Sequence, residues 1–163
     1  MPSNMILEEM QALSQAAESG FALAFHIQYT RPTFLFQTYP DAWISEYSEK
    51  GMVMSDPTVH WGFENDGTRR WSDLAEQDSA GVLKSAASHG LRYGVTCAFG
   101  SGESRSMCSF SRADREFEDT ECAALFDSVK KLHAATEGMA TLNDAQLADL
   151  EKIGVTVSQP GGR

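Results

Sequence analysis

Strand-forming segments occur in pairs along this chain, and the pairing limits how its sheet can be built. Residues 21–29 and 33–38 lie on either side of a proline break, and residues 95–99 and 106–111 flank a glycine-rich turn at 100–103. Each arrangement is typical of a β-hairpin, whose two strands run antiparallel. Strands that alternated singly with helices would instead favour a parallel sheet. The chain is therefore predicted to form an antiparallel sheet.

Helical segments lie before, between and after these strand pairs. Apolar residues recur at three- and four-residue spacing over residues 4–18 and 74–89. Further helices are predicted at 40–51 and from 114 to about 137, and a short strand is predicted at 68–71. Helices grouped around an antiparallel sheet are typical of the α+β class, so we expect an α+β sandwich.

Composition restricts the function classes. The 163 residues are 42% hydrophobic and 22% charged, which is typical of one globular domain and not of a disordered chain. The formal net charge of −10 repels phosphate backbones, so we expect no direct nucleic-acid binding by this chain. The sequence starts without a signal-peptide pattern, and no apolar run approaches the ~20 residues that span a bilayer. We therefore expect a cytoplasmic protein with no membrane partner.

The residue types that usually hold metals or perform catalysis show no matching spacing. Cys97, Cys108 and Cys122 form neither a Cys-x-x-Cys pair nor an even set, so neither a disulfide framework nor a thiolate metal site is predicted. The sequence has no Gly-x-Ser-x-Gly nucleophile motif either. We expect no enzymatic activity, no catalytic residue, no metal site and no cofactor. Ordinary hydrogen-bonded or exposed side chains are expected for the four histidines, His26, His60, His89 and His133.

The most informative part of the sequence is a group of aromatic residues with polar tips. Tyr39, Trp43 and Tyr47 recur every fourth residue, which places them on one face of a helix, and Asp56 and Trp71 follow. Core packing would explain such a stripe by itself. However, buried phenols, indoles and carboxylates need hydrogen-bond partners, and an aromatic pocket with a few convergent polar groups is what a small amphiphilic ligand requires.

Some of these residues also have purely structural interpretations. Asp56 precedes Pro57, and an aspartate in this position commonly caps a helix with or without a ligand. Gly90 and Gly94 are explained by backbone conformation alone. Both interpretations of Asp56 stay open on the sequence.

These residues together resemble a known family. The run Tyr39-Pro40-Asp41-Ala42-Trp43-Ile44-Ser45-Glu46-Tyr47, then Asp56-Pro57, then Trp71, then Gly90-Leu91-Arg92-Tyr93-Gly94, looks like the signature of the LuxR-type autoinducer-binding domain, which binds acyl-homoserine lactones. The resemblance covers roughly residues 4–137. It implies an α-β-α sandwich with a central five-stranded antiparallel sheet, related to GAF and PAS sensor modules.

The resemblance also implies roles for individual residues. Asp56 would accept the amide N–H of the ligand, Trp43 would donate to the lactone carbonyl and Tyr39 would donate to the acyl-amide carbonyl. Tyr47 and Trp71 would form walls around the ring and the chain.

A strand residue and several apolar residues complete the site that the resemblance implies. Ser109 falls where the family often has a Ser or Thr near the head group. The expected acyl-chain contacts are Val59, Val82, Leu83, Ala86, Leu91 and Thr96.

The expected organisation is a sensor domain over residues 1–138, followed by a linker or tail remnant over 139–163. Full-length members of the family continue into a helix-turn-helix domain that reads DNA, and the tail remnant contains no recognition helix. The resemblance implies a quorum-sensing signal receptor that regulates transcription as a homodimer or as a heterodimer with a full-length LuxR-type regulator. The alternative is a ligand-independent dimerisation module that inhibits such a regulator.

Overall fold

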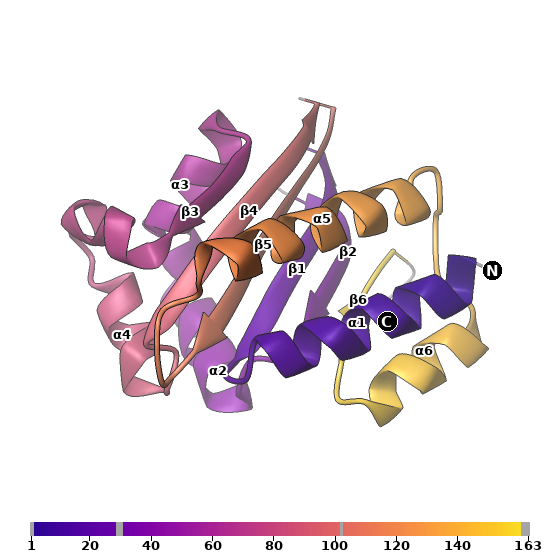
Figure 1. The fold of residues 1–163 in the computed structure, drawn as a ribbon, viewed down its shortest axis with the longest axis horizontal. Coiled ribbons are helices and arrows are strands. Elements are labelled where there is room, and N and C mark those ends of the chain that lie inside the picture. The colour runs from indigo at the N-terminus through magenta and orange to yellow at the C-terminus, as the bar shows by residue number, and fades with distance from the viewer. Residues whose placement is uncertain (1, 29–30, 102, 161–163) are drawn as a thin grey trace.

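The computed structural model describes residues 2–28, 31–101 and 103–160; Tyr29, predicted at the end of a strand, and Gly102, predicted in a turn, lie outside the described residues. The described part of the chain forms one antiparallel sheet of six strands in the order β3-β4-β5-β1-β2-β6 (Figure 1). The strands are β1 (Gly20–Gln28), β2 (Arg31–Gln37), β3 (Gly67–Arg70), β4 (Tyr93–Ser101), β5 (Ser104–Arg112) and β6 (Thr156–Ser158). The two predicted hairpins, β1–β2 and β4–β5, are confirmed.

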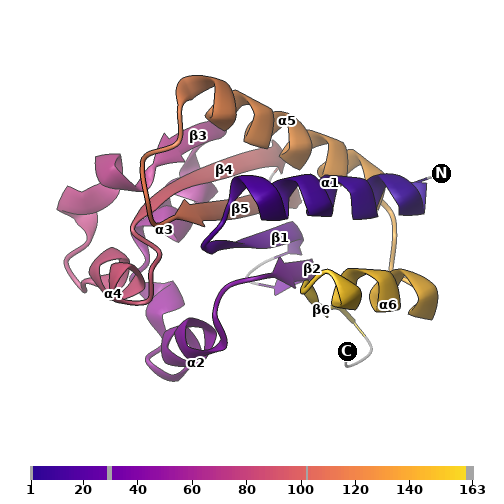
Figure 2. The same ribbon diagram turned by 60° about the horizontal axis from the view of Figure 1, so that its bottom comes forward.

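Helices cover both faces of the sheet. One face carries α1 (Pro2–Ala16), α5 (Asp119–Thr136) and α6 (Asp144–Lys152), and Figures 1 and 2 show α1 and α5 lying side by side. The other face carries α2 (Asp41–Glu49), α3 (Pro57–Glu64), α4 (Val82–Ser88) and the short 3₁₀ helices η1 (Met52–Met54) and η2 (Trp71–Gln77). The predicted α-β-α sandwich is confirmed. Among the described residues, no helix combines the length and apolar character needed to cross a membrane.

The two faces of the sheet differ in side-chain size because successive residues of a strand point in opposite directions. Large apolar side chains face α1, α5 and α6 and form the main core. Small or polar side chains face the other helices, for example Ala22, Thr96 and Ser109. This second face leaves space for bulky groups from the helices above it. The strand residues of the main core are Phe21, Leu23, Phe25, Phe34, Phe36, Val95, Cys97, Cys108 and Phe110.

The sheet has one strand more than the five expected, because the segment predicted as a linker or tail folds onto the domain. Asn143 and Gln146 form a reciprocal capping box that starts α6. Leu147 and Leu150 of α6 are buried in the main core, and β6 pairs with the edge of β2. The three-residue strand is too short to give a periodic pattern, and α6 is held in place by its contacts with the main core, which is why the sequence predicted neither.

The helix predicted over residues 74–89 is also different in the structure. It is divided into η2 and α4, because the Asp78 side chain accepts hydrogen bonds from the backbone N–H groups of Val82 (2.8 Å) and Leu83 (2.9 Å) and so starts a new helix. The long C-terminal helix begins at Asp119 and not at Asp114.

Candidate functional site

The helices on the small-residue face carry a second group of packed apolar residues, separate from the main core. We call this group the aromatic cluster. It brings together residues from α2, η1, η2, α4 and the loops next to β2 and β4. These residues extend along the sequence from position 39 to position 91. Its members are the buried Trp43, Met52, Trp71, Val82, Ala86 and Leu91 with the partly buried Tyr39, Tyr47 and Leu83.

Helix α2 carries Trp43 and Tyr47 of the predicted aromatic stripe, whereas Tyr39 lies before the helix begins at Asp41, so the prediction that all three share one helical face is wrong for Tyr39. Trp43 is 4% exposed, and its ring meets the Tyr47 ring edge to face at 5.6 Å. The Trp43 ring also lies 5.5 Å from the ring of His89, which follows α4. The stripe therefore turns inward and forms a wall between α2 and α4.

Asp56 is a buried carboxylate, 7% exposed, at the start of α3. Its Oδ1 accepts hydrogen bonds from the backbone N–H (2.8 Å) and the hydroxyl (2.7 Å) of Thr58, which confirms the capping interpretation. Its Oδ2 accepts a hydrogen bond from the Tyr47 hydroxyl at 2.8 Å. Within the described part of the chain, no cationic side chain pairs with this carboxylate. Capping thus uses one oxygen, and the other faces the aromatic cluster.

The two tyrosines beside Asp56 remain protonated at any ordinary pH. Burial, followed by the nearby Asp56 charge, raises the pKa of the Tyr47 phenol well above its usual value, and the same two causes raise the pKa of Tyr39. Both hydroxyl groups are therefore hydrogen-bond donors. Tyr47 donates to Asp56, whereas the Tyr39 hydroxyl and the Trp43 indole N–H have no hydrogen-bond partner among the described residues.

Trp71 closes the cluster from η2. Its indole N–H donates to Thr96 Oγ1 at 3.1 Å, and Thr96 Oγ1 lies 2.8 Å from Ser109 Oγ on the neighbouring strand. The Trp71 ring packs directly over Gly94, where any side chain would collide with it. Gly94 does not have a positive φ, so the prediction that its backbone conformation explains the glycine is wrong. Gly90 has φ 91°, a conformation that favours glycine, so the same prediction is confirmed there.

Of the six predicted acyl-chain residues, Thr96 lies on β4 beneath Trp71, and the other five divide into two groups. Val82, Leu83, Ala86 and Leu91 belong to the aromatic cluster. Val59 lies on α3, is partly buried and lies outside that cluster as the described residues define it. Two further residues were not predicted: Met52, which is buried in the cluster, and Thr58, which holds Asp56. A threonine two residues after a capping aspartate could have indicated the second of these.

A surface groove of about 430 Å³ lies between β3 and α5, away from the aromatic cluster. Its walls include the exposed charged residues Arg69, Asp73 and Asp119. Ligand sites are usually enclosed and mostly apolar, so this open polar groove is a poor candidate.

The fold also brings two of the four histidines together. His26 and His133, which lie 107 residues apart in the sequence, approach one another beside Glu137. The spacing along the chain gave no sign of this group, since its members come from β1, α5 and the residue after α5.

Comparison with known proteins adds an independent observation. A family model described as the autoinducer binding domain matches residues 10–136. The regulatory protein SdiA of Escherichia coli (strain K12) is 35% identical over 71 residues, which cover 43% of this chain and 30% of SdiA.

Solved structures share the fold. A crystal structure of Escherichia coli SdiA matches with a TM-score of 0.66 at 23% identity, covering 88% of this chain and 65% of that one. SdiA in complex with octanoyl-rac-glycerol also gives 0.66, at 20% identity, covering 94% of this chain and 70% of that one. CepR2 of Burkholderia cenocepacia, described as an N-acylhomoserine lactone dependent LuxR family transcription factor, gives 0.57 at 16% identity, covering 85% and 95%. The chain thus spans less than two thirds of the SdiA molecule in the first of these.

Proposed function

The chain belongs to the autoinducer-binding domain family, and we propose that it senses a signal by burying an N-acyl-homoserine lactone in the aromatic cluster. The family consists of signal-binding domains of transcription regulators and is not an enzyme family, so a quorum-sensing signal-binding role follows from membership. The ligand, its pose and the consequences of binding are our proposal.

The observation that carries the proposal is the buried carboxylate of Asp56. An ionised carboxylate offers about four acceptor positions, and three are used by Thr58 and Tyr47. The remaining position is on Oδ2, on the side of the aromatic cluster. A buried charge without a cationic partner is costly unless hydrogen bonds satisfy it. The amide N–H of the ligand would supply the missing hydrogen bond.

Two donors beside Asp56 match the two carbonyl groups of such a ligand. The Trp43 indole N–H would donate to the lactone carbonyl, and the Tyr39 hydroxyl would donate to the acyl-amide carbonyl. Neither group has a partner among the described residues, and both belong to the aromatic cluster. Tyr47 and Trp71 would form the walls of the site, because their own polar groups are already bonded to Asp56 and Thr96.

The small-residue face of the sheet would form the floor of the site. Thr96 and Ser109 lie opposite one another on β4 and β5, and their hydroxyls are hydrogen-bonded. Ser109 would thus reach the head group, directly or through water. Burial of the acyl chain against apolar side chains contributes ~0.8 kcal/mol per methylene group. That chain would contact Val59, Val82, Leu83, Ala86, Leu91 and Thr96.

The relatives support a ligand with an acyl chain and a polar head. CepR2 is described as dependent on N-acylhomoserine lactone, and SdiA forms a complex with octanoyl-rac-glycerol. Both descriptions refer to ligands that combine an apolar and a hydrogen-bonding part, as the aromatic cluster does.

We also propose that this chain acts as a dimer, either with a second copy or with a full-length LuxR-type regulator. Val53 and Met54, which follow the cluster residue Met52 in η1, are 48% and 80% exposed, and Phe63 of α3 is 45% exposed. Exposed apolar groups of this kind are typical of association surfaces. The alternative function is dimerisation that no longer depends on a ligand.

Thermal unfolding of the purified chain against acyl-homoserine lactones of several chain lengths tests the proposal. A ligand at a hundred times its dissociation constant adds ~2.7 kcal/mol to stability, which is roughly 5–10 °C in Tm for a domain of this size. We expect a selective rise for a narrow range of chain lengths. A flat response to the whole panel, with an unchanged dimer in analytical ultracentrifugation, would contradict lactone binding and favour the ligand-independent alternative.

A further inference from the structure

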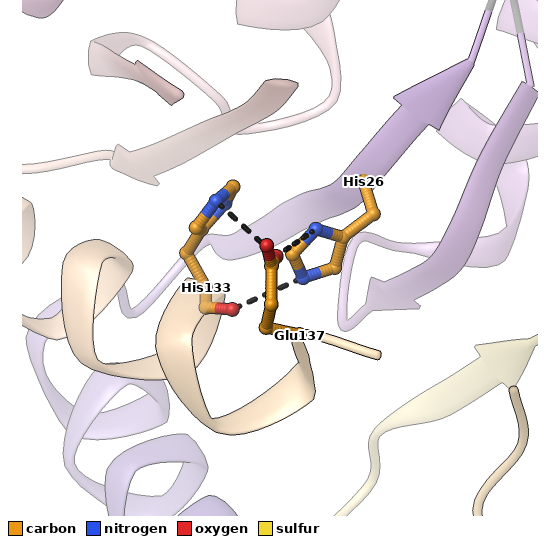
Figure 3. A group of neighbouring side chains, drawn as sticks. All are labelled: His26, His133 and Glu137. Carbon is orange, nitrogen blue, oxygen red and sulfur yellow. Dashed lines mark hydrogen bonds and ion pairs between the residues drawn. The ribbon is translucent and has the colours of Figure 1, made fainter. Parts of the chain in front are cut away.

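On the opposite side of the sheet from the aromatic cluster, three side chains converge at the end of α5 (Figure 3). His26 comes from β1, His133 from the last turn of α5, and Glu137 caps that helix. One ligand atom of each lies within 4.8 Å of the other two. His26 is 7% exposed, whereas the Glu137 side chain is 59% exposed, so the group opens to solvent on one side.

An irregularity in β1 directs His26 into this group. Ala24 pairs with Met107 and Ile27 with Arg105, so Phe25 and His26 together oppose the single residue 106 of β5. His26 has φ 56°, the only positive φ of a non-glycine residue among those described. This conformation costs free energy and persists where the surroundings require it, commonly at functional positions. The bulge turns the imidazole toward α5 instead of toward the aromatic cluster.

The hydrogen bonds of His26 fix which ring nitrogen carries the hydrogen. Nε2 lies 3.0 Å from the backbone carbonyl oxygen of His133, and a carbonyl only accepts. The Thr136 hydroxyl, 2.9 Å from Nε2, uses its own hydrogen on the carbonyl of Leu132 at 2.7 Å. Nε2 therefore carries a hydrogen, and whenever the ring carries no second hydrogen the lone pair of Nδ1 faces Glu137.

That arrangement leaves more acceptors than hydrogens. His26 Nδ1 lies 3.2 Å from Glu137 Oε2, and both are acceptors. The Ser104 hydroxyl is 2.6 Å from Nδ1 and 3.3 Å from Oε2, but it has a single hydrogen to donate. Two lone pairs that face one another at this distance need a positive charge between them.

His133 adds a third lone pair. Its Nδ1 is 2.7 Å from the Ser106 hydroxyl, which also lies 3.2 Å from the backbone N–H of His26. Ser106 can donate to this nitrogen or accept from it; in the tautomer that carries its hydrogen on Nδ1 and donates it to Ser106, the Nε2 lone pair faces Glu137 Oε2, 3.8 Å away, and a metal ion at Nε2 would select this tautomer. When Nε2 of a histidine binds a metal, a hydrogen bond from its Nδ1 to a polar group such as Ser106 orients the ring.

We propose that His26 Nδ1, His133 Nε2 and Glu137 Oε2 bind one Zn²⁺ ion. Zn–N and Zn–O distances of about 2.0–2.2 Å place neighbouring ligand atoms of a tetrahedral site about 3.3 Å apart. The two separations from Glu137 Oε2 are 3.2 and 3.8 Å, and all three ligand atoms lie within 4.8 Å of one another, so the side chains would move closer together around the ion. The Ser104 hydroxyl, 2.6 Å from His26 Nδ1, lies beside the fourth position and would bind the ion or hydrogen-bond a water on it. Two neutral imidazoles and one carboxylate are a common zinc ligand set.

Zinc at this site would tie the bulge of β1 to the end of α5 and to the segment that leads into α6. It would thus stabilise the face of the sheet that carries α1, α5 and α6, without contact with the proposed lactone site. This proposal reverses the sequence-based prediction that the histidines have no metal-binding role, and it does not depend on the proposed function.

Zinc titration of this chain in competition with a chromophoric chelator tests the proposal. The informative variant is Glu137→Gln, because its exposed side chain is replaced by one of the same shape and the fold should be retained. We expect one zinc ion per wild-type chain, and at least tenfold weaker binding in Glu137→Gln. The matched control, His60→Gln, removes an exposed histidine elsewhere and should bind zinc as the wild type does.

Cobalt(II) provides a second measurement that does not depend on stability. Cobalt bound by the two histidines and Glu137 should give visible d–d bands and no thiolate charge-transfer band, and the d–d bands should be lost in His26→Asn. Zinc binding that is equal in the wild type and Glu137→Gln, or no binding at all, would overturn the proposal, and a proton on His26 would then be the charge that separates the lone pairs.

Discussion

At the scale of single residues, the smallest side chains on the sheet determine where the largest ones lie. Gly94 is on the face of β4 that carries the aromatic cluster, and the indole of Trp71 occupies the space directly above it. The same indole donates to Thr96 two residues along the strand. The position of one wall of the proposed site therefore depends on the absence of a methyl group.

Gly94→Ala should destabilise the chain by about 1–3 kcal/mol, because the added methyl group forces Trp71 off its packing position. Urea unfolding measures the change. In a Trp71→Leu background, the same glycine substitution should cost much less, since the colliding ring is gone. Equal costs in the two backgrounds would show that the contact with Trp71 is not the reason for glycine at this position.

Helical periodicity explains why part of the site was predictable. Trp43 and Tyr47 are four residues apart on α2, so the sequence alone places them on one helical face; Tyr39 reaches the aromatic cluster from the loop before α2, which helical spacing does not explain. The group at His26 and His133 was not predictable, because a β-bulge and a helix end bring together residues that no local pattern links. The role of Gly94 was missed for the same reason: its neighbour is distant in the sequence.

At the scale of elements, the predicted hairpins formed as expected because turn sequences and strand composition are local signals. The order in which hairpins join is not local, since β1 pairs with β5 across the middle of the sheet. The sequence also predicted no structure for α6 and β6, whose burial depends on contact with the main core. Elements of this length are stabilised by tertiary packing more than by their own propensity.

One buried arginine links β5 to the end of α1 and to the loop that follows β5. Arg112, 8% exposed at the end of β5, donates to the carbonyl of Ala16 at the end of α1 (3.1 Å) and to both carboxylate oxygens of Asp114 (2.9 Å each). The hydrogen bond from Arg112 lowers the pKa of Asp114 to about 2. The folded state therefore holds this carboxyl group ionised at a pH where the unfolded chain is already protonated.

This pKa predicts a loss of stability in acid. The contribution of Asp114 is fully present above its ordinary pKa of 3.8 and is lost as the pH falls toward about 2. Asp114→Asn should therefore show a shallower fall of the urea midpoint between pH 5 and 2 than the wild type. Asp127→Asn removes an exposed carboxylate of α5 and is the control, with the wild-type slope expected. Identical slopes in wild type and Asp114→Asn would contradict the assignment.

At the scale of the whole molecule, the two faces of the sheet have different roles: one forms the main core and the other supports the proposed binding site. Its large-residue face forms the main core with α1, α5 and α6, and this core does not include the aromatic cluster. Its small-residue face supports the helices that carry the proposed binding site. Occupancy of that site would add its binding free energy to a domain that the other face already holds together.

The most direct test of this account compares lactone binding by the wild type and Asp56→Asn. Asparagine is also a good helix cap and keeps an oxygen for Thr58, but it replaces the acceptor Oδ2 with a donor amide. Calorimetry with the most stabilising lactone should show at least tenfold weaker binding, or about 1.4 kcal/mol, and urea unfolding without ligand measures separately the cost of losing the Tyr47 hydrogen bond to Oδ2. Wild-type affinity in Asp56→Asn, with Asp127→Asn also unchanged, would contradict the proposed role of the buried carboxylate and the ligand pose built on it.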